Sequence, residues 1–220
     1  HVLKVNASAG LSGRDTMSIQ PVIYSARLLT AAVRVESHAA SLLDSGAVEA
    51  LDYACVNDFS CMSISLSSNA AGAAVTLIGR NEGGKTLSRA AVNAVLDTWA
   101  DCFDPEHPRH GYQAMRILPD ARRVATMAVS DANKKLMLAH DSLLDSLVAG
   151  LTLDDDNPRR GQDGADALQE ICAGVLHELA LYGPGASVLR SHKPTMNALR
   201  VLFRVGTKDS RERASAALFE

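Results

Sequence analysis

The sequence predicts an all-α protein made of stacked helical repeats, and three observations lead to that prediction. First, apolar residues recur at positions i, i+3, i+4 and i+7 over most of the chain, which is the spacing of a helix with one buried face. Alternating apolar and polar runs typical of strands are absent from the sequence. Second, Ala and Leu are abundant while aromatic residues make up 4%. This composition favours close helix–helix packing, because both residues are strong helix formers and Ala lets backbones approach.

The third observation is internal repetition, because four segments share one pattern. Each segment begins with a polar or Gly-rich stretch, followed by a short apolar segment. A break of small or polar residues comes next, and an apolar pair at i and i+3 then marks the start of a second helix. The four segments begin at Ser37, Gly83, Asn133 and Gly185. Their apolar pairs are Val48/Leu51, Val92/Val95, Leu144/Leu147 and Met196/Leu199, and the first members of successive pairs are 44, 52 and 52 residues apart.

Longer Ala-rich segments with helical spacing lie between these repeats and predict a third, longer helix in each. They cover residues 21–33, 66–78, 121–129 and 165–182, and residues 211–220 resemble the start of another. The clearest example is the segment 165–182, whose apolar positions are Leu168, Ile171, Cys172, Val175, Leu176 and Leu179. That pattern predicts a helix buried along a broad face.

Two insertions make the repeats longer than about 42 residues. Residues 102–111 and 152–164 are dense in Pro, Asp, Arg and Gly, which predicts loops between helices. Such insertions leave the stacking of a repeat array intact. We therefore expect a single repeat domain over residues 1–220. The chain starts at His1 rather than Met and its last helical segment stops at Glu220, so we also expect a fragment of a longer protein.

The stretch DSGAVEAL (residues 44–51) resembles the armadillo repeat, in which a turn leads into the pattern G-A-I/V-x-x-L. The segments 167–180 and 69–79 resemble armadillo third helices, and the resemblance extends over nearly the whole chain as four to five degenerate repeats. It implies a right-handed α-solenoid of three-helix repeats that binds partners along a concave groove. A HEAT-like array of helix pairs is the alternative that the pattern leaves open.

The resemblance also implies where a partner would bind. In armadillo proteins that bind nuclear signals, an Asn near the end of each third helix pairs with the backbone of an extended peptide. The matching positions here are Thr30, Thr76, Thr126 and Glu178, with Glu220 in the last helix, and none of them is Asn. We therefore expect a different groove ligand, basic toward the C-terminal end because the Glu carboxylate is an acceptor only. The alternative for the threonines is a hydrogen bond back to their own helix.

One short motif points to a different function. Residues 79–86 read GRNEGGKT and match the P-loop pattern G-x-x-x-x-G-K-S/T. A P-loop requires a strand before its glycines, but residues 73–78 belong to a segment whose counterparts in the other repeats are helical. In the repeat alignment Lys85 corresponds to Ser41, Met137 and Leu189, none of which is basic. The repeats thus predict a turn between stacked helices at this place.

One part of the P-loop interpretation does not depend on the fold. Glycines ahead of a helix N-terminus expose backbone N–H groups that bind anions. We therefore retain a candidate anion site formed by Arg80, Gly83, Gly84 and Lys85.

The sequence predicts no catalytic residue, metal site or cofactor. Cys102, His107 and His110 are a zinc-like set, but no fourth ligand is spaced nearby. The acidic run 154–156 lacks the spacing of a calcium loop, so a solvated loop is expected there. Ser, His and Asp residues are plentiful, yet none lies on a strand–turn–helix elbow.

Net charge, hydropathy and cysteine usage indicate which classes of partner and which compartment to expect. The formal charge of −3 argues against a nucleic-acid surface. No apolar run approaches the roughly 18 residues that a membrane helix needs. The four cysteines are scattered without a CxxC pair, which indicates free thiols in a reducing compartment. We therefore expect a protein of the cytoplasm, with the nucleus as the alternative, and no nucleic-acid or membrane partner.

The function that these observations favour is a non-enzymatic scaffold that binds a protein or peptide along the concave surface of the repeats. We also expect self-association through the truncated repeat ends, where apolar surface is left uncovered. A regulatory module that senses a nucleotide-type metabolite, or restrains an attached catalytic domain, is the first alternative. A P-loop enzyme acting through residues 79–86 is the second.

Overall fold

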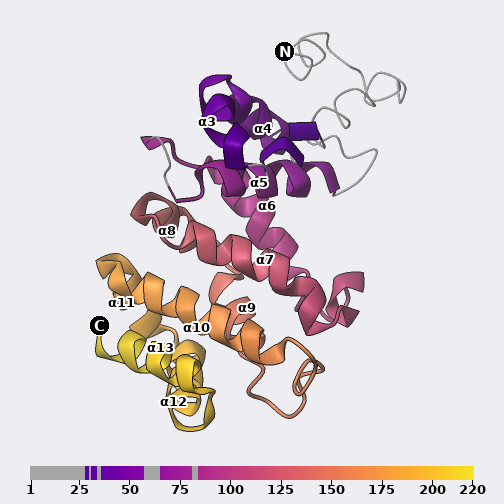
Figure 1. Cartoon of the computed structure of the whole chain (residues 1–220). Helices are drawn as coiled ribbons and strands as arrows, with labels where there is room; N and C mark the ends of the chain where they lie inside the picture. The colour runs from indigo at the N-terminus through magenta and orange to yellow at the C-terminus, as the bar shows by residue number, and fades with distance from the viewer. Residues whose placement is uncertain (1–27, 30, 34–35, 57–64, 81–83) are drawn as a thin grey trace. The chain divides into compact units, whose positions relative to one another are not determined.

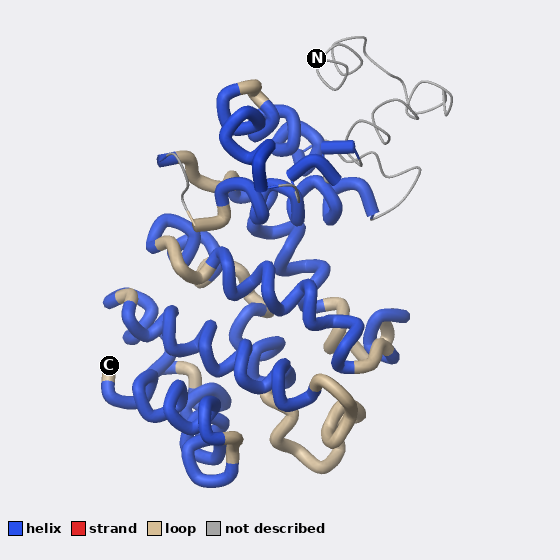
Figure 2. Tube along the Cα trace, in the orientation of Figure 1, coloured by secondary structure: helices blue, strands red, loops and turns tan. Residues whose placement is uncertain are grey.

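The computed structural model describes residues 28–29, 31–33, 36–56, 65–80 and 84–220. Within these ranges every regular element is a helix (Figure 2), which confirms the all-α prediction. The chain divides into two compact units, residues 1–95 and 96–220, and the boundary falls inside helix α6 (Arg89–Ala100). The helix predicted at 21–33 lies mostly outside the described residues, as does Thr30.

The N-terminal unit is built from α3 (Glu36–Asp44), α4 (Ala47–Val56), α5 (Ser65–Ile78) and the first residues of α6. Helix α3 packs against α4, and α4 packs against α5. Gly46, between α3 and α4, has a φ of 80°, a left-handed conformation that commonly ends helices and that glycine adopts without steric cost. From residue 70 to residue 78, α5 buries every residue except Thr76, because its alanines allow close packing.

The C-terminal unit contains the end of α6 and a series of further helices. These are the 3₁₀ helix η2 (Pro108–Gly111), α7 (Ala114–Met127), α8 (Asp131–Met137), α9 (Leu143–Gly150), α10 (Ala165–Leu181), α11 (Gly183–Ser191), α12 (Lys193–Val205) and α13 (Lys208–Phe219). The long helix α10 packs against both α7 and α13 (Figure 1). Helix α9 packs against α12. Helices at the same place in successive predicted repeats thus contact each other, as they do in helical-repeat proteins.

The helices come in groups that match the predicted repeats. Helices α3–α5, α8–α10 and α11–α13 form groups of three, and the second repeat supplies α6 and α7. Residues 85–88, where a first helix of that second repeat would lie, have no regular secondary structure. The described residues of GRNEGGKT therefore lie in the connection between α5 and α6.

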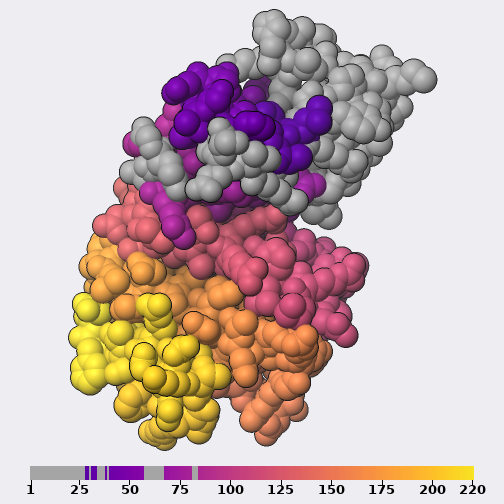
Figure 3. Space-filling model, viewed as in Figure 1, coloured from indigo at the N-terminus to yellow at the C-terminus, as the bar shows by residue number. Residues whose placement is uncertain are grey.

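The apolar pairs identified in the sequence mark the buried sides of the second helices. Their second members, Leu51, Val95, Leu147 and Leu199, are each 3% exposed or less. The largest fully buried side chains of the C-terminal unit include Trp99, Ile117, Met127 and Leu168. In the space-filling view, the side chains of α7 to α13 close the gaps between their ribbons (Figure 3).

One buried arginine links the two insertion loops through hydrogen bonds. Arg159, in the second insertion, is 1% exposed. Its Nε donates to the carbonyl oxygen of Tyr112 at 3.0 Å, and its Nη2 donates to the carbonyl oxygens of His110, at 2.7 Å, and Cys102. Its guanidinium carbon lies 5.0 Å from the ring centroid of Phe103. The insertions lack α-helix, as predicted, and the acidic run 154–156 is exposed, as expected of a solvated loop. Arg159 of the same insertion, however, is a buried cation that binds the first insertion.

Candidate functional site

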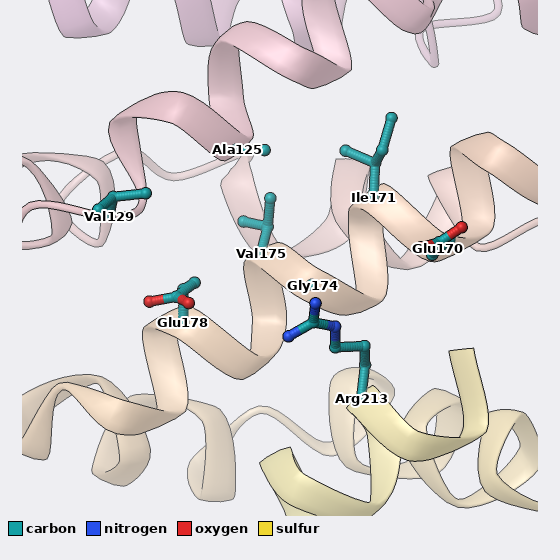
Figure 4. Close-up of a pocket in the computed structure, with 8 residues that line it drawn as sticks. All are labelled: Ala125, Val129, Glu170, Ile171, Gly174, Val175, Glu178 and Arg213. Carbon is teal, nitrogen blue, oxygen red and sulfur yellow. The ribbon is translucent and has the colours of Figure 1, made fainter. Parts of the chain in front are cut away.

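The strongest candidate for a functional site is a groove on the C-terminal unit that crosses α7, α10 and α13 (Figure 4). Its volume is about 250 Å³. Most of the lining comes from one face of α10. The lining residues are Ala125 of α7 and Val129 just after it, Glu170, Ile171, Gly174, Val175 and Glu178 of α10, and Arg213 of α13.

Gly174 keeps the middle of the groove open. A Cβ atom added at this position would meet no atom within 4 Å, so the space beside the helix is empty. Figure 4 shows Ile171 and Val175 directed toward α7, whereas the Arg213 side chain extends from α13 toward Gly174. The groove therefore combines an apolar wall on one side with a guanidinium on the other.

Charges of both signs line this groove. Glu170 is exposed and Glu178 is half-buried. The Oε2 atom of Glu178 lies 3.6 Å from Nζ of Lys134, which is longer than a hydrogen bond. Lys134 is also 3.0 Å from Oδ1 of Asp131, so its charge is shared between two carboxylates. Within the described part of the chain, neither Glu170 nor Arg213 has an ion-pair partner.

The structure places the predicted groove residues in different situations. Glu178 lines the groove. Thr126 lies beside the lining residue Ala125, and its Oγ1 donates to the carbonyl oxygen of Arg122 at 2.9 Å. Thr76 is in the N-terminal unit, and its Oγ1 donates to the carbonyl oxygen of Gly72, also at 2.9 Å. Both threonines thus make the hydrogen bond to their own helix that the alternative interpretation expected.

Of the residues that line the groove, sequence reasoning predicted only Glu178 as a binding residue. Glu170 and Gly174 precede Glu178 by eight and four residues, so they share its helical face, and that spacing could have identified them. Arg213 had no such signal. It reaches the groove because α13 packs against α10, which the sequence pattern of α13 alone does not reveal.

Lys85, the central residue of the candidate anion site, is bound within the N-terminal unit. Its Nζ donates to the carbonyl oxygen of Leu43 at 2.9 Å and lies 3.3 Å from Oε1 of Glu49. Leu43 is in the last turn of α3, where carbonyl groups lack helical partners and the helix dipole favours a cation. An anion at Lys85 would therefore compete with a helix end and a carboxylate.

The remaining residues of the candidate anion site do not form a helix N-terminus. Gly84, with a φ of 71°, is followed by residues 85–88 before α6 begins. The Oγ of Ser88 accepts from the backbone N–H of Ala91 at 3.1 Å, so this serine caps α6. Arg80 is exposed in the turn after α5, and Gly83 lies outside the described residues. Helix α5 also occupies the place of the strand that a P-loop requires.

The cysteines are free thiols where they are described. Cys102 and Cys172 are buried and Cys55 is half-buried, while Cys61 lies outside the described residues. Burial raises the pKa of all three thiols above the ordinary value, to about 12 for Cys55. His107 accepts the backbone N–H of Arg109 at Nδ1, 3.2 Å away. Among the described residues, no group of three His, Cys, Asp or Glu side chains is placed to hold a metal ion.

Comparisons with protein-family models, curated proteins and solved structures found no match to this chain. In the described part of the chain, no helix has the length and apolar character needed to cross a membrane. The functional inference therefore rests on the groove across α7, α10 and α13 and on the charges that line it.

Proposed function

We propose that this chain is a non-enzymatic scaffold of armadillo type, which binds a peptide segment of a partner protein in the groove across α7, α10 and α13. Two features support a repeat array. Helix α10 packs between α7 and α13, and α9 packs against α12, so equivalent helices of successive repeats contact each other. The proposal extends this arrangement to a right-handed solenoid. The observation that carries the function is the open groove itself, located on the third helices.

The lining of the groove defines the kind of segment that would fit. The half-buried Ile171 offers apolar surface to an aliphatic side chain, with the buried Val175 beside it, while Glu170 and Glu178 attract a basic residue. Arg213 suits a carboxylate or a backbone carbonyl, since its guanidinium donates hydrogen bonds only. The volume of about 250 Å³ is below the roughly 300–1,000 Å³ of pockets for drug-sized molecules, so it matches one or two side chains of a peptide.

A peptide-display screen tests the proposal directly. The intact chain is used to select binders from a random-peptide phage library, and the selected peptides are synthesised and titrated by fluorescence anisotropy. We expect sequences with an aliphatic residue next to Lys or Arg. A Cβ atom at Gly174 meets no atom within 4 Å, so Gly174→Leu places its side chain in the open space of the groove and should weaken binding at least about tenfold.

The control for this screen is Gly111→Leu. Gly111 is exposed, its added Cβ would also meet nothing within 4 Å, and it does not line the groove. Peptide affinities should therefore be the same for this variant and the unmodified chain. Selected peptides that bind Gly174→Leu as tightly as the unmodified chain would show that the groove is not the binding site.

A further inference from the structure

The groove across α7, α10 and α13 carries its charges at regular intervals along α10. Glu170, Gly174 and Glu178 follow one another at four-residue steps on one face of the helix. Because a helix rises about 1.5 Å per residue, the two glutamates lie about 12 Å apart along its axis, with Gly174 midway. The guanidinium of Arg213 lies beside Gly174, between the two glutamates (Figure 4). The groove therefore presents a negative, a positive and a negative side chain in that order.

These three charged side chains can be reached by a ligand. Glu170 and Arg213 are exposed, and neither has an ion-pair partner among the residues that the structure describes. Glu178 is half-buried, and its charge is partly offset by Lys134, whose Nζ lies 3.6 Å from Oε2. Glu170 and Arg213 therefore keep their charges available for a partner, and Glu178 does so in part.

The wall of the groove on the side of α7 is apolar. It is formed by Ala125, Val129 and Ile171, and Val129 is 48% exposed although it is a large apolar side chain. Figure 4 shows Ile171 directed toward α7, away from Arg213. A segment that lies along α10 thus has charged side chains on one side and aliphatic ones on the other.

This arrangement has the spacing of an extended peptide. Two residues of an extended chain cover about 6.6 Å, close to the roughly 6 Å that separate Gly174 from each glutamate along the helix axis. Successive side chains of an extended chain point to opposite sides, so every second residue faces the charges and those between face the apolar wall. A helix is about 10–12 Å across and fits a groove of about 250 Å³ less well.

We infer, on the basis of the proposed function, that the partner segment is extended and alternates charged with aliphatic residues, in the order basic, aliphatic, acidic, aliphatic, basic. Its acidic residue pairs with Arg213, and its basic residues pair with Glu170 and Glu178. Its two aliphatic side chains occupy the volume of the groove. Arg213 is then the residue that selects for the central acid.

The test uses two synthetic peptides of equal composition and different order. The alternating peptide is Gly-Lys-Leu-Glu-Leu-Lys-Gly-amide and the reordered peptide is Gly-Lys-Lys-Leu-Leu-Glu-Gly-amide, each labelled with fluorescein at its N-terminus and titrated with the intact chain by fluorescence anisotropy. We expect the alternating peptide to bind at least about fivefold more tightly, because only its order brings each charge to an opposite charge.

A double-mutant cycle then tests the role of Arg213. Arg213→Ala should weaken binding of the alternating peptide about fivefold, and it should change little for the same peptide with Gln in place of its Glu. Arg213→Glu should reverse the preference, so that the peptide with Lys at the centre binds more tightly than the one with Glu. The matched control is Arg211→Ala, which removes an exposed arginine of the same helix that does not line the groove. It should bind the alternating peptide like the unmodified chain.

Three results would overturn the inference. They are the absence of binding by the alternating peptide, equal binding of the two peptides, and a cycle without coupling between Arg213 and the central acid. The Gly174→Leu variant distinguishes this failure from failure of the proposed function. If peptides selected from the library lose affinity in Gly174→Leu, the groove is a binding site and only the charge pattern assigned to its ligand is wrong.

Discussion

Arg159 shows how much one side chain can contribute to the order of two loops. Its side chain is almost fully buried. Its guanidinium donates hydrogen bonds to the carbonyl oxygens of residues 102, 110 and 112, which lie between 47 and 57 positions earlier in the chain. The fork of N–H donors on arginine suits several acceptors at once, which a lysine ammonium cannot match in this geometry. The residue therefore links stretches that contain no α-helix.

Replacing Arg159 should destabilise the protein strongly. In Arg159→Met, the buried carbonyl oxygen of Cys102 and the partly buried carbonyl oxygens of His110 and Tyr112 lose their donor, and each unsatisfied buried group costs about 1–3 kcal/mol. We expect the free energy of unfolding to fall by roughly 3–5 kcal/mol. The measurement is equilibrium urea unfolding followed by circular dichroism.

The neighbouring residue provides the control for this change. The Arg160 side chain is 50% exposed and pairs with Asp155, itself 92% exposed. An exposed ion pair contributes about 0–1 kcal/mol, so Arg160→Met should leave the unfolding transition nearly unchanged. Equal losses in the two variants would mean that burial of Arg159 is not what stabilises the loops.

At the scale of single helices, two glycines have opposite consequences. Gly174 lies in the interior of α10 beside open space, whereas Gly150 ends α9 against Cys172 and Trp99. A Cβ on Gly150 would lie 2.6 Å from Sγ of Cys172 and 3.2 Å from the Trp99 ring. The first glycine is therefore not required by packing, and the second is.

Alanine at the two positions should change stability in opposite directions. Gly174→Ala should raise the free energy of unfolding by up to about 1 kcal/mol, because alanine has the higher helix propensity and meets no obstacle. Gly150→Ala should lower it by about 1–3 kcal/mol through overpacking. Thermal unfolding of the two variants measures both effects, and a stabilised Gly150→Ala would contradict the packing of α9 described above.

The sequence predicts a feature well when that feature depends on residues close together in the chain, and poorly when it depends on contacts between distant segments. Helical spacing and Ala-rich composition predicted the helices. The second members of the i, i+3 pairs are buried, as Leu51 and Leu199 show, whereas the first members Val48, Leu144 and Met196 are half-buried.

The groove was predicted only at Glu178, because its other members depend on which helices pack together. The burial of Arg159 was not predicted, for the same reason. The carbonyl oxygens that accept its hydrogen bonds belong to residues 47 to 57 positions earlier, and its Pro- and Asp-rich surroundings in the sequence give no sign of burial.

At the scale of the whole molecule, large apolar side chains are exposed on the last two helices. Val201, Phe203 and Val205 of α12 are 43%, 51% and 71% exposed, and Phe219 of α13 is 88% exposed. Exposed apolar side chains of this size often mark association surfaces. Self-association of the chain stays a prediction, and these exposed side chains are the positions at which we test it.

We expect the chain to associate with itself as its concentration rises. Light scattering coupled to gel filtration should give an average mass above the 23.3 kDa of one chain. The double variant Phe203→Ser with Phe219→Ser should return the mass to that of one chain, whereas Met115→Ser, at another exposed apolar position on α7, should not. A mass of one chain at every concentration of the unmodified protein would rule out this association.

Among the described residues, the second predicted repeat has one helix fewer than the other groups, and the boundary between the two compact units falls inside its α6. In a repeat array, cooperativity passes from each repeat to the next through the surface that they share. The two compact units are expected to behave as separate foldons, each with its own free energy of opening in hydrogen exchange, rather than as one all-or-none transition.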